Sequence, residues 1–383
     1  MTQEHTIIPL EIKRVSNRRE LKTFIGVPFT LYQDSPYWVP PLISDDLATF
    51  NPKKNPAYET AQTRLFVAYR DGVPVGRIAA ILNYAANKKY QTKNLRFGWF
   101  DTINELEVAR SLFAAVEAWA RELGMETLTG PHGFCDFDPQ GMLTQGYDQL
   151  PTIATYYNYP YYVELTVRCG FEKEVDYVEF LTPAPTKTGI PPKLERIAKR
   201  VRERSKLKVV NFKNKRQLLK RAPELFQLVD ETFEEIYGSV PLSEKQMRYY
   251  IKKYISFVNY RTVKIAVNER DEMVGFMLAM PSLSRGFQKA KGRLLPLGWW
   301  HILKSLRSYD VLDFYLAGIR SQYRGTGVDL LMQLQMIEVA LDLGFNAAES
   351  NPELESNKKV QAQWKYFNPV LHKRRRIFRK RVA

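Results

Sequence analysis

Residues Asp310 to Gly327 read DVLDFYLAGIRSQYRGTG, a β-rich run that ends in a glycine-containing turn. From Val328 onwards, apolar residues recur at helical spacing, as at Leu331, Leu334 and Leu341. In a strand, glycine turn and helix of this kind, consecutive peptide N–H groups point outward and the helix dipole adds partial positive charge. Glycines also allow a phosphate to approach the backbone. The stretch therefore predicts a pyrophosphate-binding turn.

A predicted β-hairpin precedes this stretch, and a similar hairpin occurs in the N-terminal half. Val263 to Leu283 reads VKIAVNERDEMVGFMLAMPSL, two strand-like runs around a polar turn. Arg64 to Leu82 reads RLFVAYRDGVPVGRIAAIL, in which Asp71-Gly72 suits a tight turn. Gly275 and Gly76 occupy the same place in the two hairpins. This repetition indicates that one domain has been duplicated.

Further elements recur in the same order in both halves. The stretch from Val108 to Trp119 has helical apolar spacing, and both predicted helices end in a Leu-Gly pair, Leu123-Gly124 and Leu343-Gly344. A short strand is expected after each, at Thr127 to Thr129 and Asn346 to Glu349. The expected order is strand, helix, hairpin, strand, helix, strand. The predicted fold class is α+β, with two lobes that each contain a mixed, mostly antiparallel sheet flanked by helices.

Length and composition agree with two lobes. A chain of 383 residues exceeds the size of most single hydrophobic cores, and 45% of its residues are apolar. Prolines at 183, 185, 191 and 192 interrupt regular structure and mark a linker. Pro191-Pro192 then opens a helix with an apolar face and several basic residues, which is either solvated or in contact with phosphate or membrane. We expect lobes at 1–182 and 207–383, joined by a linker and basic helix at 183–206.

The net charge of +16 favours anionic partners without naming one. Nucleic acid, an anionic membrane surface and a phosphate-rich cofactor all stay open at this point. Cys135 and Cys169 are too few for a disulfide framework and are expected to be buried apolar residues. Met1 to Val15 lacks a basic stretch followed by an apolar one, so no secretory signal is predicted. These features predict a cytoplasmic protein.

The turn resembles motif A of the GNAT acyltransferase superfamily, in which Arg or Gln is followed after two residues by Gly, then by any residue and by Gly or Ala. Two registers fit in part. A start at Arg324 places Gly327 correctly but puts Asp329 at the final small position, whereas a start at Gln322 fits Gly325 and Gly327. An inward-pointing Asp329 would repel pyrophosphate. The resemblance implies that acyl-CoA is bound by the strand end and the turn: Ile319, Gln322, Tyr323, Arg324, Gly325, Thr326 and Gly327.

A second block, Asn357 to Phe367, resembles the GNAT helix in which a tyrosine seven residues after the asparagine protonates the leaving thiolate. Trp364 stands at that position, and Tyr366 follows two residues later. An indole does not supply a proton usefully at neutral pH. The resemblance therefore implies Tyr366 as the candidate acid, and the alternative is that both aromatic residues serve packing.

The first lobe resembles a degenerate GNAT copy. At the equivalent of motif A, Asp101 to Glu107 reads DTINELE, which is acidic and free of glycine, so we expect no CoA there. Arg168 to Phe171 resembles the usual Gly-Phe ending of a GNAT helix-strand junction. In plan, one active and one degenerate lobe is similar to the N-myristoyltransferases and FemABX peptidyltransferases.

Three residues are candidate general bases for acyl transfer to an amine. His132 lies in a loop that also contains Asp136 and Asp138. Asp313 lies on the strand that enters the turn, and Glu349 ends the following strand. The choice among the three stays open, and no metal is expected.

Two basic segments complete the chain's unusual features. The insertion Pro281 to Tyr309 combines six basic residues with leucines and tryptophans and contains no acid, which suits either an anionic membrane surface or a lid over an acceptor cleft. His372 to Arg381 reads HKRRRIFRKR and is expected to be the last strand of the second lobe, with a basic exposed side.

These patterns predict an N-acyltransferase that uses acetyl-CoA or a longer acyl-CoA and no metal, with direct attack of an amine on the thioester. The apolar insertion favours a hydrophobic or lipid amine as acceptor. The whole chain is similar to bacterial two-lobed GNAT-like proteins, a group that includes the bacterial ceramide synthase type. The alternatives are a basic nucleic-acid-binding or regulatory protein, and a GNAT scaffold without catalysis. Expected partners are acyl-CoA and an amine, with peripheral contact to an anionic membrane and no nucleic acid.

Overall fold

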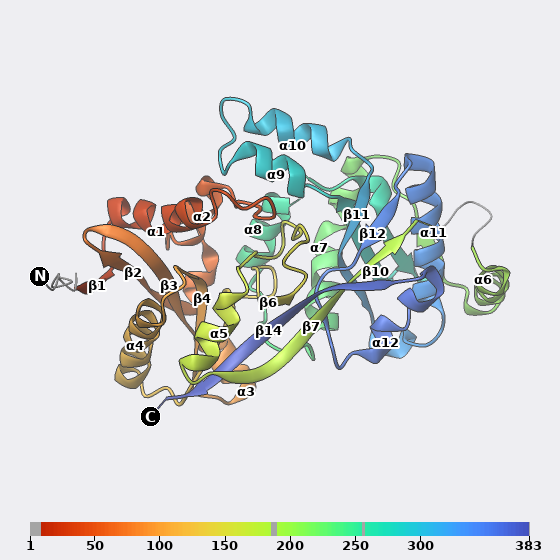
Figure 1. The fold of residues 1–383 in the computed structure, drawn as a ribbon. Helices are drawn as coiled ribbons and strands as arrows, with labels where there is room; N and C mark the ends of the chain where they lie inside the picture. Colours follow the sequence, from red (N-terminus) through yellow and green to blue (C-terminus); the bar gives the residue numbers. More distant parts are fainter. Residues whose placement is uncertain (1–8, 185–189, 255–256, 383) are drawn as a thin grey trace, which may run out of the picture. The chain divides into compact units, whose positions relative to one another are not determined.

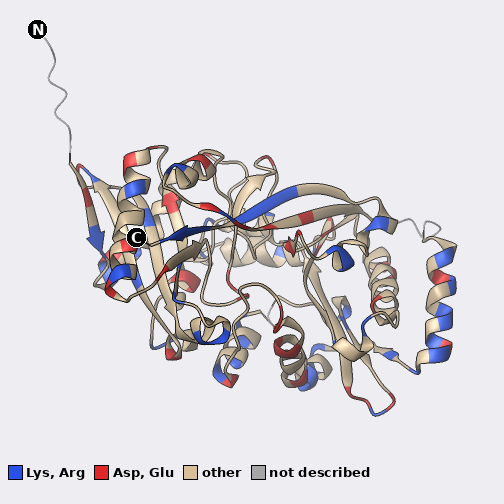
Figure 2. Cartoon of the chain, turned by 90° about the horizontal axis from the view of Figure 1, so that it is seen from below, with Lys and Arg blue, Asp and Glu red and all other residues tan. Residues whose placement is uncertain are grey.

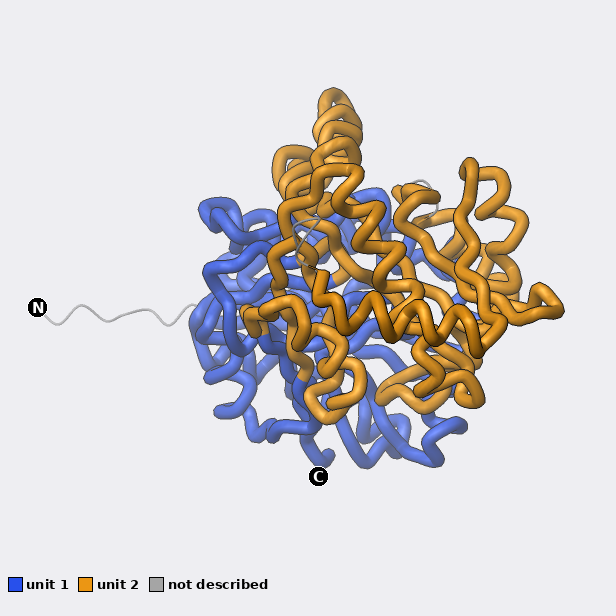
Figure 3. The backbone as a smooth tube through the Cα atoms, turned by 90° about the vertical axis from the view of Figure 1, so that its right-hand side faces the viewer, with its two compact units in different colours: residues 1–151, 155–176, 374–383 blue, residues 152–154, 177–373 orange. Residues whose placement is uncertain are grey.

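The computed structural model describes residues 9–184, 190–254 and 257–382 (Figure 1). Two predictions fall partly outside the described residues. They are the absence of a secretory signal, which concerns residues 1–8, and the linker, which includes residues 185–189. The chain forms two compact units, coloured separately in Figure 3. Unit 1 comprises residues 1–151, 155–176 and 374–383, and unit 2 comprises residues 152–154 and 177–373. Their boundaries thus differ from the predicted division at 182 and 207.

Unit 1 is built on a sheet with the strand order β1-β2-β3-β4-β5-β14, and β6 pairs with β14. The β4–β5 pair is parallel and the other pairs are antiparallel. Its elements are β1 (Leu10–Arg14), α1 (Arg18–Leu31), α2 (Ile43–Thr49), η1 (Pro56–Glu59), β2 (Ala61–Arg70), β3 (Val73–Asn83), α3 (Tyr84–Tyr90), β4 (Asn94–Thr102), α4 (Leu106–Glu122), β5 (Thr127–Gly130), β6 (Met142–Gln145) and α5 (Tyr161–Arg168).

Helices cover both faces of this sheet, and the alternation of side chains along the strands explains why. On β3, Ile78 and Ala80 pack into the core beneath α4, whereas Ala79 and Ile81 pack into the core beneath α1. The predicted hairpin is confirmed, because Asp71 and Gly72 between β2 and β3 both have positive φ angles, as a two-residue turn of this class requires.

Unit 2 repeats the plan with the strand order β7-β12-β11-β10-β9-β8, and β13 pairs with β7. Here β11–β12 is the parallel pair. Its elements are α6 (Pro192–Ser205), β8 (Lys208–Val210), α7 (Lys215–Phe233), α8 (Glu244–Tyr254), η2 (Tyr260–Thr262), β9 (Val263–Val267), β10 (Met273–Pro281), α9 (Ser284–Ala290), α10 (Gly298–Leu306), β11 (Val311–Ile319), η3 (Ser321–Tyr323), α11 (Val328–Leu343), β12 (Ala347–Glu349), β13 (Glu353–Leu354), α12 (Lys358–Gln361) and η4 (Trp364–Phe367).

The paired glycines of the two hairpins have the same role. A Cβ on Gly76 would lie 3.0 Å from Leu112 of α4, and a Cβ on Gly275 would lie 3.2 Å from Met332 of α11. In each unit, glycine thus lets the helix that follows the parallel strand pack closely on the hairpin. The α+β class and its mixed, mostly antiparallel sheets are confirmed.

The predicted basic helix is α6, which packs onto α11 through Ala198, Leu331 and Leu334. Its other faces carry Lys and Arg (Figure 2). Among the helices in the described residues, none combines the length and apolar content needed to cross a bilayer.

Strands β7 (Glu172–Pro183) and β14 (Val370–Arg381) each contribute to both units. The predicted C-terminal strand exists, but residues 374–381 of β14 pair with β5 and β6 in unit 1, so its assignment to the second lobe was wrong. The expected basic exposed side is also wrong in part, because Lys373 and Arg375 are fully buried. Sequence identifies a strand, but the partner of a terminal strand depends on which sheet edge is open.

Candidate functional site

The parallel pairing of β11 with β12 ends at Asp313 opposite Glu349. On the other side of β11, Leu278 of β10 faces Leu316 while Ala279 faces Phe314, so Tyr315 is a bulged residue with no partner. A bulge leaves backbone groups outside the ladder and re-aims the neighbouring side chains. The point where β11 leaves β12 therefore combines two acidic side chains with irregular backbone.

A buried charge cluster surrounds this point. Glu179 of β7 and Lys373 of β14 are fully buried, as is Asp313, and Glu349 is nearly so. The Lys373 ammonium lies 3.2 Å from a Glu179 carboxylate oxygen and forms an ion pair with Glu349. One ammonium thus faces three carboxyl groups. Because uncompensated buried charge is costly, we expect one of the carboxyls to be protonated.

Asp313 is the carboxyl of this cluster whose charged form is disfavoured. Burial, followed by the negative charge of Glu349, holds the pKa of Asp313 well above its ordinary value. The Tyr315 hydroxyl donates a hydrogen bond of 3.3 Å to Asp313. This point thus places on β11 a carboxyl whose charged form is disfavoured, beside the carboxyl of Glu349 on β12, which is ion-paired with Lys373.

His372 adds a second titratable group on the other side of Glu349. Its Nε2 atom lies 3.5 Å from Glu349 Oε1, and neither of its ring nitrogens has a hydrogen bond among the described residues. Glu349 therefore contacts both Lys373 and His372, two consecutive residues of β14. A carboxylate in this position can accept a proton from a nucleophile and pass it on.

The turn between β11 and α11 is open. Gln322, Arg324, Gly325 and Thr326 are exposed, and Gly325 and Gly327 have φ angles of +78° and +86°. No side chain caps the first turn of α11, although Asp329 lies there. The amides of Gly325 and Gly327 make no backbone hydrogen bond within the described ranges. Free N–H groups at a helix N-terminus are the donors that a pyrophosphate needs.

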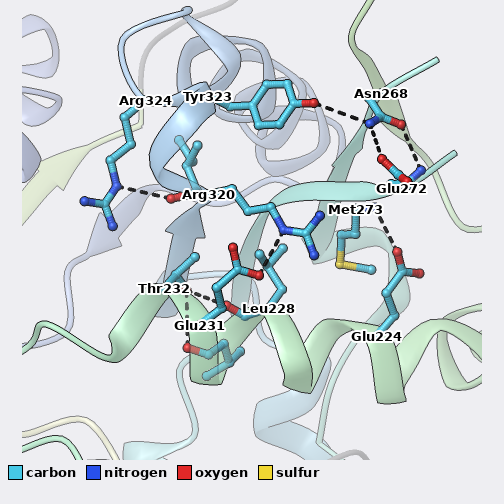
Figure 4. Close-up of polar contacts among 12 residues, drawn as sticks. Glu224, Leu228, Glu231, Thr232, Asn268, Glu272, Met273, Arg320, Tyr323 and Arg324 are labelled. Atoms are coloured by element: carbon cyan, nitrogen blue, oxygen red, sulfur yellow. Dashed lines mark hydrogen bonds and ion pairs between the residues drawn. The ribbon is translucent and has the colours of Figure 1, made fainter. Parts of the chain in front are cut away.

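Neighbouring elements of unit 2 hold this turn in place (Figure 4). Arg320 forms an ion pair of 3.0 Å with Glu231 of α7, and Arg324 donates to the carbonyl of Ile319 at 3.2 Å. The Tyr323 hydroxyl accepts a 3.4 Å hydrogen bond from Asn268 in the β9–β10 turn. The Cβ position of Gly327 is only 2.6 Å from Val201 of α6, so a larger residue would not fit.

The other predicted catalytic residues, His132 and Tyr366, lie on other parts of the chain. His132 belongs to unit 1, where burial, reinforced by nearby Arg96, lowers the pKa of His132 well below its ordinary value. Tyr366 lies in η4, is 38% exposed and has the Lys365 ammonium over its ring. The structure thus brings Asp313 and Glu349 together, and it places His132 in unit 1 and Tyr366 in η4.

Trp364 has a packing role. Its ring contacts Phe314 edge-on at 5.4 Å, and its Nε1 donates a 2.7 Å hydrogen bond to Glu353. Burial raises the pKa of Glu353 to about 7, partly opposed by this hydrogen bond. The residue at the position of the GNAT tyrosine therefore stabilises the strand next to the cluster.

Sequence reasoning missed Lys373, His372 and Glu179. The run HKRRRIFRKR was read as a solvated basic strand. One signal was present: Lys373 and Arg375 alternate with Ile377, and all three are fully buried on one face of β14. Glu179 sits in the apolar run YVEF and carried no motif.

Unit 1 also contains a parallel strand pair beside a bulged strand, but the side chains at that point are different. The β4–β5 pairing ends at Arg96 opposite Thr129, and β4 bulges at Trp99, which has a φ angle of +44°. Arg77 and Asp101 form a buried ion pair of 2.7 Å beside a cavity of about 40 Å³ lined largely by aromatic residues. That cavity has room for a few water molecules.

The turn after β4 is acidic, as the sequence indicates. Glu105 and Glu107 are both ion-paired with Arg70 of β2, and Glu105 provides no side-chain cap to α4. The carboxylates therefore occupy the place where unit 2 has glycine.

Known proteins match the chain along almost its whole length. No protein-family model matches it. It is 25% identical over 381 residues to Protein YghO of Escherichia coli, covering 97% of this chain and 95% of that protein. It is 26% identical over 368 residues to the bacterial ceramide synthase of Caulobacter vibrioides, covering 94% of each.

Among solved structures, a tandem GNAT protein from the clavulanic acid biosynthesis pathway matches with a TM-score of 0.58 and 13% identity, covering 98% of this chain and 99% of that chain. The chain therefore has the tandem GNAT fold, with two GNAT-like lobes along its whole length.

Proposed function

We propose that this protein is an acyl-CoA-dependent N-acyltransferase and that unit 2 carries out the reaction. The observation on which this rests is that one strand, β11, carries Asp313 opposite Glu349 near its start and leads into the open glycine turn at its end. An acyl-CoA with its pyrophosphate on the amides of the turn would run along β11 toward the point where β11 and β12 part. Its thioester would then lie beside the charge cluster.

In the proposed reaction, the nitrogen of a neutral amine attacks the thioester carbonyl carbon. Glu349 accepts the proton that the attacking nitrogen loses, and its ion pair with Lys373 holds the carboxylate in place. The C–S bond then breaks, and the thiolate takes up this proton to give free CoA and an amide. The raised pKa of Asp313 disfavours a second negative charge near the developing oxyanion, and the backbone at the Tyr315 bulge is suited to hydrogen-bond the oxyanion. His132 and Tyr366 have no role in this proposal.

The proposed acceptor is a hydrophobic or lipid amine. Two features support it: the chain is similar along its length to a bacterial ceramide synthase, and the insertion after β10 exposes leucine and tryptophan side chains in unit 2. Ceramide is an amide of a long-chain amino alcohol, so an amine of that class is the substrate to test first. Acetyl-CoA and long-chain acyl-CoA are the donors to compare.

The test is a turnover assay with the full chain. Wild-type protein is incubated with acyl-CoA of different chain lengths and with long-chain and short polar amines. CoA release is followed with a thiol reagent and the amide is identified by mass spectrometry. Both cysteines are buried, so the background reaction of the protein is expected to be small.

We expect CoA release that depends on a long-chain amine and yields the matching amide. Glu349→Gln should lose most of this turnover, while Tyr366→Phe should retain it. Release of CoA by neither short nor long amines, together with no thermal stabilisation by CoA, would refute the proposal. Stabilisation by CoA without turnover would instead favour a scaffold that binds CoA and does not catalyse.

A further inference from the structure

The insertion between β10 and β11 exposes an unusual apolar surface. It forms two helices, α9 and α10, which lie side by side in unit 2 (Figure 1). Phe287, Ala290 and Ile302 are buried, which fixes the two helices to each other and to the unit. The loop between them and the outer face of α10 expose six large apolar side chains: Leu294, Leu295, Leu297, Trp299, Trp300 and Leu303.

This apolar surface is too large and too concentrated to be ordinary surface variation. Leu295 and Leu297 are 76% and 61% exposed, respectively. The six residues fall within ten consecutive positions, whereas exposed large apolar residues elsewhere in the described chain are scattered singly or in pairs. Isolated exposed apolar residues are normal, but a contiguous apolar patch marks a binding surface.

Basic side chains border the apolar surface. Arg285, Lys289, Lys291 and Arg293 are exposed on α9 and the loop, and Lys304 and Arg307 are exposed on α10. No acidic residue occurs from Ser282 to Tyr309. The Lys304 ammonium lies over the Trp300 ring at 5.5 Å, so cation and indole share one surface. A partner must therefore be apolar at its centre and anionic around it.

We propose that α9 and α10 dock the protein on an anionic phospholipid bilayer. The leucine and tryptophan side chains enter the boundary between headgroups and acyl chains, and the basic residues contact lipid phosphates. A second copy of this chain would place like charges against each other, which disfavours self-association through this surface. Charge complementarity thus selects the bilayer.

The docking surface is connected to the candidate active site within unit 2. The insertion starts at Pro281, and the amide of the next residue, Ser282, donates a 2.9 Å hydrogen bond to the carbonyl of Val311 on β11. On the same strand pair, Met280 faces Asp313. A lipid amine held in the bilayer would therefore meet the segment that joins β10 to β11, the strand that carries Asp313. The docking proposal does not need the transferase proposal, because vesicle binding is measured without substrate.

The test is flotation of the full chain with vesicles of phosphatidylcholine that contain increasing phosphatidylglycerol. The apolar variant is Leu295→Ser with Leu297→Ser and Trp300→Ser, and the charge variant is Lys289→Gln with Lys291→Gln and Arg293→Gln. Two matched controls are changed elsewhere. Lys193→Gln with Arg196→Gln and Lys199→Gln removes the same charge from exposed positions on α6, and Val73→Ser removes an exposed apolar residue from unit 1.

We expect wild-type protein to bind phosphatidylglycerol vesicles and to bind pure phosphatidylcholine weakly. Each basic residue near the surface contributes roughly fivefold to partitioning, so the charge variant should bind about 100-fold more weakly. The apolar variant should also lose binding, and the two controls should stay within about twofold of wild type. Brominated lipid should quench wild-type fluorescence more than that of Trp299→Phe with Trp300→Phe.

Three results would overturn the proposal. The first is equal loss of binding in the α6 control, because binding would then depend on diffuse charge. The second is unchanged flotation of both α9–α10 variants. The third is a change in mass by light scattering in the apolar variant without a change in flotation, which would identify the surface as a protein contact. Circular dichroism of every variant verifies that it is folded.

Discussion

At the scale of single residues, the proposed reaction depends on the Lys373 ammonium. It is shared among the carboxyl groups of Glu179, Asp313 and Glu349. Glu349 is ion-paired with Lys373, and burial together with the charge of Glu349 raises the pKa of Asp313 beside it. Removal of the proposed base should therefore affect the chemical step and leave CoA binding intact. We predict that Glu349→Gln lowers the turnover number by about 10²- to 10⁴-fold. Single-turnover kinetics, with CoA affinity by calorimetry as the control, would measure it, and an equal loss of affinity would argue against a role in proton transfer.

Lys373 has a structural role that can be measured separately. Removing one partner of a buried charge cluster leaves the other uncompensated, so Lys373→Met should cost about 3–5 kcal/mol of unfolding free energy. Adding Glu349→Gln removes part of the excess negative charge and should recover some of that loss. Urea unfolding of the single and double variants tests this. No recovery in the double variant would mean that packing, and not charge, accounts for the loss.

The raised pKa of Glu353 leads us to predict that the free energy of unfolding depends on pH. Its folded pKa is about 7, above the ordinary value of 4.5, so the folded protein binds more protons than the unfolded chain between these values. Stability from this group is therefore present below pH 4.5 and lost as the pH rises to about 7. Glu353→Gln keeps an acceptor for Trp364 and should be more stable than wild type at pH 8 by about 2–3 kcal/mol, with no gain at pH 4. Thermal unfolding across this range measures the difference, and a constant offset would contradict the assignment.

At the scale of elements, the glycine turn offers a matched comparison. Gly325 and Gly327 both have positive φ angles, but only Gly327 contacts Val201 of α6, and a Cβ on Gly325 would meet open space. Gly325→Ala should therefore cost only the strain of the backbone, about 1 kcal/mol, and Gly327→Ala clearly more. Val201→Ala in the Gly327→Ala background should reduce the difference. Equal costs in denaturant unfolding would show that α6 does not pack there in solution.

The helices and strands also show which features the sequence could predict and which it could not. Both hairpins, both helices with Leu-Gly ends and the turn after β11 were predictable, because each depends on local periodicity and turn chemistry. Asp313 and Glu349 were identified because Asp313 lies on the predicted strand that enters the glycine turn and Glu349 ends the predicted strand that follows. Lys373 and Glu179 were not, because their burial depends on the long-range pairing of β14 and β7, which carries no local signal. The same reason explains the wrong lobe for residues 374–381.

At the scale of the whole molecule, the C-terminal strand belongs to the unit that begins the chain. Phe378 of β14 lies in the core of unit 1 with Phe97 and Phe171. Phe378→Ala should therefore destabilise unit 1 by about 3–5 kcal/mol. Hydrogen exchange should become faster in β5 and α4 before it changes in α11. Faster exchange confined to α11 would contradict the assignment of this strand to unit 1.

Whether the glycine turn of unit 2 binds acyl-CoA is tested most directly by amide hydrogen exchange. The exchange is measured in the turn from Gly325 to Val328, with and without saturating acyl-CoA. We predict that acyl-CoA slows the exchange of the amide hydrogens in this segment. The equivalent turn of unit 1, Asp101 to Glu107, should not change and serves as the control. Unchanged exchange at Gly325 and Gly327 in the presence of CoA, or protection of the unit 1 turn instead, would contradict the proposal that the turn of unit 2 binds acyl-CoA.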